Sequence, residues 1–255
     1  MNRNERFAPD KVARLEIRLA WATLEISADD VDQVQLIVSG TDADVDDLKV
    51  SLEGGTLSVE QPSYGLTPRI DLVRWMQIFV RLPRNWRGAV TASTIAGPLR
   101  AEGLEGSDLC LETVSGDLRT RNLTAIEAKL RTVTGHILSD GLQAERLGLR
   151  TISGSSQVDG IRSRTARFSS VSGSWQLGFA APFQSLEGAS VSGDVCVTAP
   201  MDAVHLISHG KSGRVILERM LQREDAPTVT LTEVAGQAVL IGSAQAEAAS
   251  TGKAE

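Results

Sequence analysis

The chain has 255 residues, of which 42% are apolar and only 4% aromatic, and its formal net charge is −6. A chain of this length buries a sizeable aliphatic core. The acidic balance argues against a nucleic-acid partner, because phosphate contacts need a local excess of Lys and Arg. The sequence has no apolar run of ~18 residues that could span a bilayer, and its first residues lack the apolar centre of a signal peptide. We therefore expect a cytoplasmic protein without direct membrane insertion.

Residues 1–92 are predicted to form a strand-rich cap region. Five short segments alternate apolar and polar residues, which is the period of a strand, and turns containing Asp or Gly separate them. The segments are 15–19, 24–26, 34–38, 48–52 and 57–59. A sixth, residues 75–83 (WMQIFVRLP), is expected to be the last strand before the repeats, and Pro83 should end its ladder.

Aspartates crowd the turns of this region, most densely at residues 42–47 (DADVDD). A calcium-binding loop requires a glycine and a bidentate glutamate at fixed offsets, and this segment has neither. We interpret it as a solvated acidic loop.

A short phrase returns at a nearly constant interval from Thr94 onwards. It reads TIAG, TVSG, TVTG, TISG, SVSG and SVSG. Its closing glycines are Gly97, Gly116, Gly135, Gly154, Gly173 and Gly193, so the step is constant until the last interval, which is longer by a single position. Self-similarity at a period of about 19 residues is typical of a solenoid, whose units bury their apolar faces by stacking on their neighbours.

The contents of one unit favour strands over helices. In residues 113–131, Val114, Leu118 and Thr120 follow an even spacing and interleave with polar residues. A second apolar set comprises Leu123, Ile126, Ala128 and Leu130. Because the period is an odd number, alternation cannot run unbroken around a coil. Corners are therefore expected at the glycine phrase and near Asn122, Gly141 and Gly160, which leaves two or three strands per coil.

The repeat predicts which side chains stack. Leu130, Leu149 and Phe168 should form one buried column. In another column Trp175 should follow the small Ser156, so that a large side chain neighbours a small one.

The repeat continues less regularly towards the C-terminus. Gly213 follows Gly193 after about one repeat, Gly236 follows after a somewhat longer interval, and both precede apolar strands. Residues 222–227 should be an excursion from the coil, and residues 243–255 should be a disordered tail. The sequence thus predicts an all-β protein with a strand-rich cap region at 1–92, a right-handed parallel β-helix or β-solenoid of ~19-residue coils at 93–242, and the tail at 243–255.

Candidate chemical groups do not converge in this arrangement. One outward column would contain Asp117, His136, Ser155, Ser174, Asp194 and Arg214. Asp117 and Asp194 would lie four coils, roughly 19 Å, apart, too far to act on one bond. His205 and His209 would be ~13 Å apart on a strand, too far to share a metal ion. We predict no catalytic, cofactor-binding or metal-binding residue.

The two cysteines are predicted to be free thiols. Cys110 and Cys196 belong to coils on the order of 20 Å apart, whereas a disulfide needs Cα atoms within about 7 Å.

Two surface patterns remain. Pairs such as Thr113/Ser115 and Thr132/Thr134 resemble the Thr-x-Thr array of ice-binding β-solenoids, but hydroxyls that cap backbone groups at a corner are the favoured interpretation. A strip of Arg and Lys residues around positions 119–167 is interleaved with Asp and Glu, which is typical of a mixed surface.

The order of these motifs resembles a known family. The segment IFVRLP, followed by TIAG and then by TVSGDL-like units, is similar to the bacterial β-strand-repeat "putative adhesin" family of unknown function, the toast-rack superfamily. The resemblance extends from Leu15 to Ile241 and implies a right-handed β-helix with an N-terminal strand region. It also implies a link to adhesion or to cell-envelope stress regulation, and it supplies no catalytic residue.

Our functional hypothesis is a noncatalytic scaffold or protein-interaction module without a cofactor. Its partner would be another protein, and self-association remains open. The alternative is a polysaccharide-binding or polysaccharide-active β-helix, which a groove with two carboxylates ~5 to 9.5 Å apart would favour.

Overall fold

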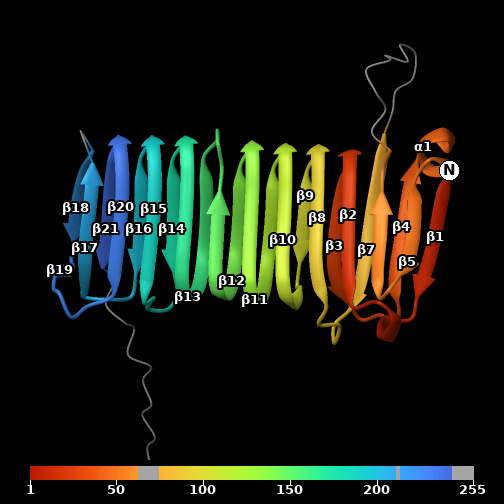
Figure 1. The fold of residues 1–255 in the computed structure, drawn as a ribbon, viewed down its shortest axis with the longest axis horizontal. Coiled ribbons are helices and arrows are strands. Elements are labelled where there is room, and N and C mark those ends of the chain that lie inside the picture. Colours follow the sequence, from red (N-terminus) through yellow and green to blue (C-terminus); the bar gives the residue numbers. More distant parts are fainter. Residues whose placement is uncertain (63–74, 211–212, 243–255) are drawn as a thin grey trace, which may run out of the picture.

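The computed structural model describes residues 1–62, 75–210 and 213–242, and the predicted tail at 243–255 lies outside them. The protein is an all-β solenoid whose strands lie side by side along one long axis (Figure 1). The helical elements are η1 (Pro9–Lys11) and α1 (Asp42–Asp46). The strands are β1 (Asn2–Phe7), β2 (Arg14–Trp21), β3 (Thr23–Asp29), β4 (Val34–Gly40), β5 (Lys49–Glu53), β6 (Thr56–Glu60), β7 (Met76–Pro83), β8 (Ala89–Ala96), β9 (Leu99–Glu102), β10 (Glu105–Ser115), β11 (Leu118–Thr134), β12 (Ile137–Arg150), β13 (Ser156–Ser172), β14 (Trp175–Phe179), β15 (Ser185–Ser192), β16 (Val195–Ala199), β17 (Ala203–Gly210), β18 (Arg214–Glu218), β19 (Leu221–Gln222), β20 (Thr228–Ala235) and β21 (Gln237–Gly242).

The central coils stack in register as parallel strands. Leu118 on β11 pairs with Ile137 on β12, which pairs with Ser156 on β13, so successive partners are one repeat apart in the sequence. Two faces result. The β9 face contains β3, β9, β14, β16, β21 and the first halves of β11–β13, and the β8 face contains β2, β8, β10, β15, β20 and the second halves of β11–β13. The right-handed sense of the coil stays a prediction.

The repeated glycines form one corner of every central coil. At Gly154, φ is +131°, a backbone conformation that side chains other than glycine's rarely adopt. A Cβ at this position would lie 2.1 Å from the carbonyl oxygen of Gly135 in the preceding coil. The corner therefore requires glycine for two reasons, its backbone conformation and the close approach of the next turn.

The second corner of the coil lies at the positions that the sequence predicted. Asn122 has a φ of +52°, and Gly141 and Gly160 have φ values of +70° and +68°. Asn is the non-glycine residue that best tolerates this left-handed conformation, because its short side chain can hydrogen-bond locally.

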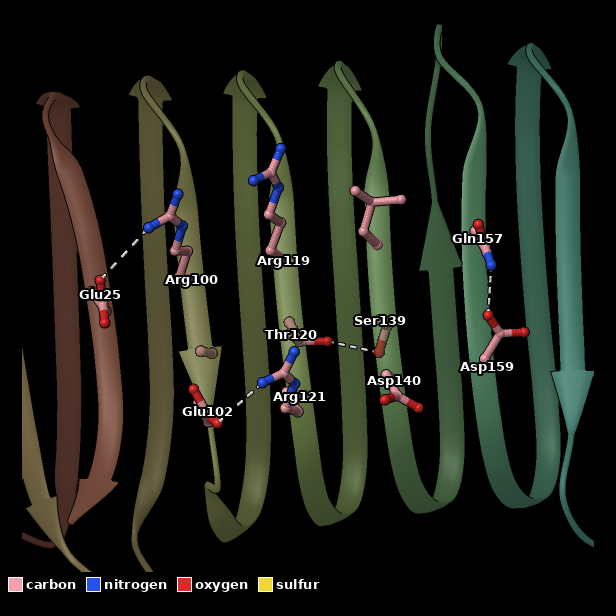
Figure 2. Close-up of a pocket in the computed structure, with 12 residues that line it drawn as sticks. Glu25, Arg100, Glu102, Arg119, Thr120, Arg121, Ser139, Asp140, Gln157 and Asp159 are labelled. Atoms are coloured by element: carbon pink, nitrogen blue, oxygen red, sulfur yellow. Dashed lines mark hydrogen bonds and ion pairs between the residues drawn. The ribbon is translucent and has the colours of Figure 1, made fainter.

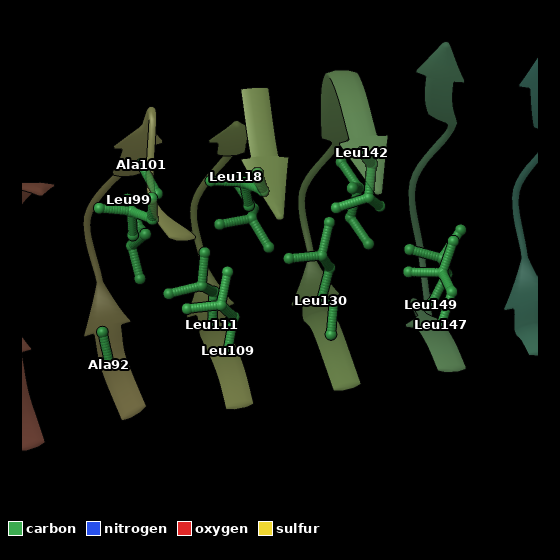
Figure 3. Packing of buried hydrophobic residues seen from close by; sticks show 14 of the residues in the cluster. Ala92, Leu99, Ala101, Leu109, Leu111, Leu118, Leu130, Leu142, Leu147 and Leu149 are labelled. Carbon is green, nitrogen blue, oxygen red and sulfur yellow. The ribbon is translucent and has the colours of Figure 1, made fainter. Parts of the chain in front are cut away.

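Aliphatic columns fill the space between the two faces (Figure 3). Leu130, Leu149 and Phe168 are in register and buried, as predicted. Trp175 occupies the column of Ser156 and is 1% exposed. Its ring centroid lies 5.7 Å from that of Phe168, a distance at which tilted aromatic pairs attract.

Part of the predicted inward set is wrong. Val114 and Ile126 are 45% and 50% exposed, whereas Thr113 is buried. The physical reason for Val114 is that the glycine corner reverses the alternation. Because the chain turns at Gly116, Val114 does not point to the same side as Leu118, although the two are an even number of positions apart.

The hydroxyl pairs do not form a flat array. Thr113 points inward and is buried, while Ser115 is exposed, so the two side chains do not share a face. Two buried hydroxyls lie at the corner instead. Thr113 Oγ1 donates to the carbonyl of Gly97 and Thr132 Oγ1 donates to that of Gly116, each at a distance of 3.4 Å. The capping interpretation holds for these two residues. The buried hydroxyls of Thr94 and Thr151 have no hydrogen-bond partner among the described residues, and those of Ser170 and Ser190 bond to each other.

At both ends the spatial order of the coils differs from the sequence order. The coil of β2 and β3 lies between β6/β7 and β8/β9. As expected, residues 75–83 form the last strand before the repeats along the chain, β7. In space, however, β3 lies between β7 and β9. Likewise β20 and β21 lie between β15/β16 and β17/β18, so Gly236, not Gly213, stacks on Gly193.

The N-terminal end is completed by antiparallel strands. β4 pairs with both β1 and β7, and β5 pairs with β6. The expected solvated loop at 42–47 is instead largely α1, in which Asp44 is buried and accepts a hydrogen bond from the Thr41 hydroxyl. We keep 1–92, 93–242 and 243–255 as a proposed division of the chain.

The cysteines agree with the prediction of free thiols, since Cys110 and Cys196 are unpaired. Burial raises the pKa of the Cys110 thiol to about 11, with further contributions from the charge of Glu112 and from the hydrogen bond that the thiol donates to the Glu112 carboxylate. Within residues 1–62, 75–210 and 213–242, neither helical element is long enough to cross a membrane.

Replacing a corner glycine should destabilise the stack strongly. We expect Gly154→Ala to lower the free energy of unfolding by about 2 to 4 kcal/mol, through backbone strain and the contact with the preceding carbonyl. Gly148→Ala is the control, because its Cβ would meet Lys129 Cγ at 3.6 Å and no closer atom. Urea unfolding followed by circular dichroism measures both variants. Equal stabilities would contradict the proposed role of the corner.

The inward and outward columns should also differ in stability. Leu149→Ala should cost ~2 to 5 kcal/mol because it leaves a cavity in the core. Arg150→Ala, at the adjacent position on the exposed side, should cost under ~0.5 kcal/mol. Denaturant unfolding of both variants is the measurement. A larger loss of stability for Arg150→Ala than for Leu149→Ala would mean that the two columns are misassigned.

Glu112 should slow the alkylation of Cys110. The thiolate is the reactive form, and a raised pKa reduces its population at pH 8. In a Cys196→Ser background, Glu112→Gln removes a charge and lowers the thiol pKa, so iodoacetamide should react severalfold faster. Glu102→Gln, on the other face, is the control and should leave the rate unchanged. A rate that Glu112→Gln does not raise would contradict the assignment.

Candidate binding surface

The β9 face carries a shallow groove that we call the charged groove (Figure 2). It encloses about 440 Å³ and crosses β3, β9 and the first halves of β11, β12 and β13. Its lining residues are Glu25, Arg100, Ala101, Glu102, Arg119, Thr120, Arg121, Leu138, Ser139, Asp140, Gln157 and Asp159. Because alternate residues of a strand point to one side, the outward side chains of neighbouring strands form columns across the groove.

One outward column of the groove consists entirely of charged residues. Glu102, Arg121, Asp140 and Asp159 are partners in successive strands. Arg121 lies 3.8 Å from Glu102, and in the neighbouring column Arg100 lies 4.0 Å from Glu25. Both pairs are exposed to solvent, so they contribute little to stability and remain accessible to a ligand.

The charge alternation ends at the two aspartates. Asp140 and Asp159 are directly aligned on adjacent strands, an arrangement in which like charges repel. The Gln157 amide donates to Asp159 over 2.7 Å, whereas Asp140 makes no hydrogen bond or ion pair within the described residues. Asp140 is therefore a carboxylate available to an external cation or hydrogen-bond donor.

Beneath the charged residues the groove has a polar layer. Thr120 Oγ1 donates to Ser139 Oγ over 2.7 Å, and both hydroxyls are buried (Figure 2). This bond joins β11 to β12 under Arg121 and Asp140. The charged side chains thus project from a hydrogen-bonded sheet, which holds their backbone positions at the spacing of the strands.

Asp140 differs in its surroundings from the acid of a glycosidase. A general acid in a glycosidase is enclosed by apolar side chains that keep it protonated, and Asp140 is exposed. Among the described residues, no three His, Cys, Asp or Glu side chains come together as metal ligands would. The arrangement offers both signs of charge to a polar partner across several strands.

The outward column considered in the sequence lies at the glycine corner, and its aspartates serve the backbone. Asp117 accepts from the His136 N–H over 3.2 Å, and Asp194 accepts from the Gln237 N–H over 3.1 Å. Arg214 is not adjacent to Asp194, because the coil that contains Gln237 lies between them.

The two C-terminal histidines lie on one strand. His205 and His209 belong to β17 and pair with Thr228 and Thr232 on β20. The segment between them is extended, which separates residues four apart by ~13 Å.

The basic strip proves to be a mixed surface. On the β8 face, Arg131 pairs with Glu112 at 3.1 Å and Arg146 pairs with Glu127 at 3.2 Å. Glu127 also contacts Lys129, and the hydrogen bonds from Lys129 and Arg146 lower its carboxyl pKa. The hollow on this face, about 730 Å³, is lined by both signs of charge with cations in excess, because Lys129, Arg131, Arg146, Arg150 and Arg167 face only Glu127 and Glu187.

The sequence held a signal for the groove. Glu102, Arg121, Asp140 and Asp159 are each one repeat apart, so the repeat alone places them in one column. Glu25 could not be found in this way, because its coil enters the stack out of sequence order.

Solved structures support the fold. Over 95% of this chain and 97% of the other, it is similar to a putative adhesin from Bacteroides fragilis NCTC 9343, with a TM-score of 0.61 and 12% identity. A putative adhesin from Parabacteroides distasonis ATCC 8503 gives 0.58 and 12% over the same shares. A protein named a putative lipid binding protein, from the same P. distasonis strain, gives 0.51 and 14%, over 93% of this chain and 96% of that one.

The sequence itself gives the family. No curated protein matches the chain. The model of the family described as Toastrack DUF4097, however, matches residues 12–226, most of the stack described above. The chain therefore belongs to the Toastrack DUF4097 family.

Proposed function

We propose that this protein is a noncatalytic binding module that recognises another protein through the charged groove. The observation that carries the proposal is the column of Glu102, Arg121, Asp140 and Asp159, which presents charges at strand spacing with one carboxylate unpaired. A partner with a cationic side chain opposite the two aspartates would relieve their repulsion. The names of the similar structures, putative adhesins, are consistent with a binding role.

A rigid scaffold favours this role energetically. The groove residues project from strands that are hydrogen-bonded on both sides, so binding does not have to order the backbone. Rim charges of this kind contribute mainly to the association rate and to the choice of partner. A scaffold that holds a partner at the cell envelope, in adhesion or in stress regulation, would use such a surface.

Polysaccharide binding or cleavage is the second candidate, and one observation favours it. Asp140 and Asp159 are aligned on neighbouring strands, and strand spacing of about 4.8 Å is near the carboxylate separation of ~5 to 5.5 Å in retaining glycosidases. Asp117 and Glu145, two other carboxylates of the central coils, do not line the groove. The solvent exposure of Asp140 argues for binding over cleavage.

Reversing the groove charges should abolish partner capture. We expect immobilised wild-type protein to retain a specific protein from the source cell, and Asp140→Lys/Asp159→Lys to lose it. The control, Asp108→Lys/Glu145→Lys, changes the net charge equally at exposed sites outside the groove and should retain the partner. Quantitative mass spectrometry of the bound fractions is the measurement.

Two results would count against the proposal. Equal retention by all three proteins would remove the groove as the contact surface. Cleavage of a glycan or polyuronate by the wild type, lost on replacing Asp117, Asp140, Glu145 or Asp159, would show an enzyme instead.

A further inference from the structure

The coil of β20 and β21 occupies a slot between two coils that precede it in the sequence. β20 pairs in parallel with β15 on one side and β17 on the other, and β21 pairs with β16 and β18. After β16 the chain leaves one coil position empty and forms β17 and β18 in the next position. It then returns, and β20 and β21 occupy the position in between (Figure 1).

The slot and the coil fit each other in size. Leu231 of β20 faces Gly188 of β15, and a Cβ at Gly188 would lie 2.7 Å from Leu231 Cδ2 and 2.2 Å from Phe168 Cζ. Glycine at this position thus leaves the space that both side chains occupy. An inserted strand needs a large apolar residue here to fill that space.

The corner of the slot is equally selective. A Cβ at Gly236 would lie 2.4 Å from the carbonyl oxygen of Gly193, so the occupant must turn at a glycine. The inward residues of the coil, among them Val229 and Leu240, are fully buried. An unrelated strand would need the same apolar spacing, a large apolar residue opposite Gly188 and a glycine at the corner. The β20–β21 coil of a second copy of this chain has all three, because its sequence is the same.

One exposed connection leads into the slot. Residues 223–225 are exposed, and Arg223 pairs with Asp225 at 2.8 Å across the turn. If the coil came from a second copy, every contact inside the slot would be the same and this connection alone would change its path. That is the condition under which domain swapping costs least.

We propose that the β20–β21 coil is exchangeable and that two copies of this chain associate by each donating it to the slot of the other. The proposal is independent of the charged groove. Intramolecular insertion has the advantage of a high effective concentration, so exchange should be favoured when unfolded chains refold together at high protein concentration.

The test uses cysteines on separate chains. Glu187 and Thr230 are register partners on β15 and β20, within the Cα separation that a disulfide requires. In a Cys110→Ser/Cys196→Ser background, the Glu187→Cys chain and the Thr230→Cys chain are unfolded, mixed, refolded and oxidised. The control mixture combines Arg146→Cys with Thr165→Cys, which are partners on β12 and β13 in the middle of the stack. A chain that carries both Glu187→Cys and Thr230→Cys verifies the register.

We expect the Glu187→Cys and Thr230→Cys mixture to give a disulfide-linked heterodimer severalfold in excess of the control mixture on non-reducing gels, with the dimer mass confirmed by light scattering. The doubly substituted chain should form its disulfide within the monomer. Equal heterodimer yields in the two mixtures would overturn the proposal. Failure of the doubly substituted chain to cross-link would also overturn it, because the slot would then not have the described register.

Discussion

The stack depends on the close approach of consecutive backbones at the glycine corner. At Gly116, Gly135, Gly154 and Gly173 a Cβ would lie only 2.1 to 2.3 Å from the carbonyl oxygen of the glycine in the preceding coil. The central coils can therefore remain parallel and in register only if each one turns at a residue without a side chain. This requirement keeps the step of the repeat constant, and the step aligns everything else: the aliphatic columns within, and the charges outside.

The same corner explains the distribution of polar groups. It reverses the alternation, which places the Thr or Ser that opens each phrase inside and the Val or Ile that follows it towards the solvent. The buried hydroxyls of Thr113 and Thr132 then donate to the carbonyls of the glycine corner, which would otherwise lack some of their partners. Further along each coil, the outward positions of the β9 face carry the charged groove. A solenoid of this kind displays functional side chains as columns, so a surface is specified by residues one repeat apart.

The two ends of the stack obey the same pairing rules with a different order of coils. β2–β3 and β20–β21 each lie between coils that are not both their neighbours in sequence. Ala22 takes the corner position next to Gly97 at one end, and Gly236 takes the position next to Gly193 at the other. An in-register parallel sheet accepts any coil with the right period. Side-chain fit, such as that of Leu231 against Gly188, then decides which coil fills each rung.

The sequence by itself determined the fold class, the corners and the columns, because a constant repeat period fixes which side chains align. Leu130, Leu149 and Phe168 could be placed in one buried column without a structure, and Glu102, Arg121, Asp140 and Asp159 could have been placed in one outward column. Only the tertiary structure decided the direction of Val114, the position of Glu25 and the insertion of β20–β21. The direction of Val114 depends on how the chain turns at Gly116. The position of Glu25 and the insertion of β20–β21 depend on which strands pair in space, because more than one order of coils satisfies the same periodicity.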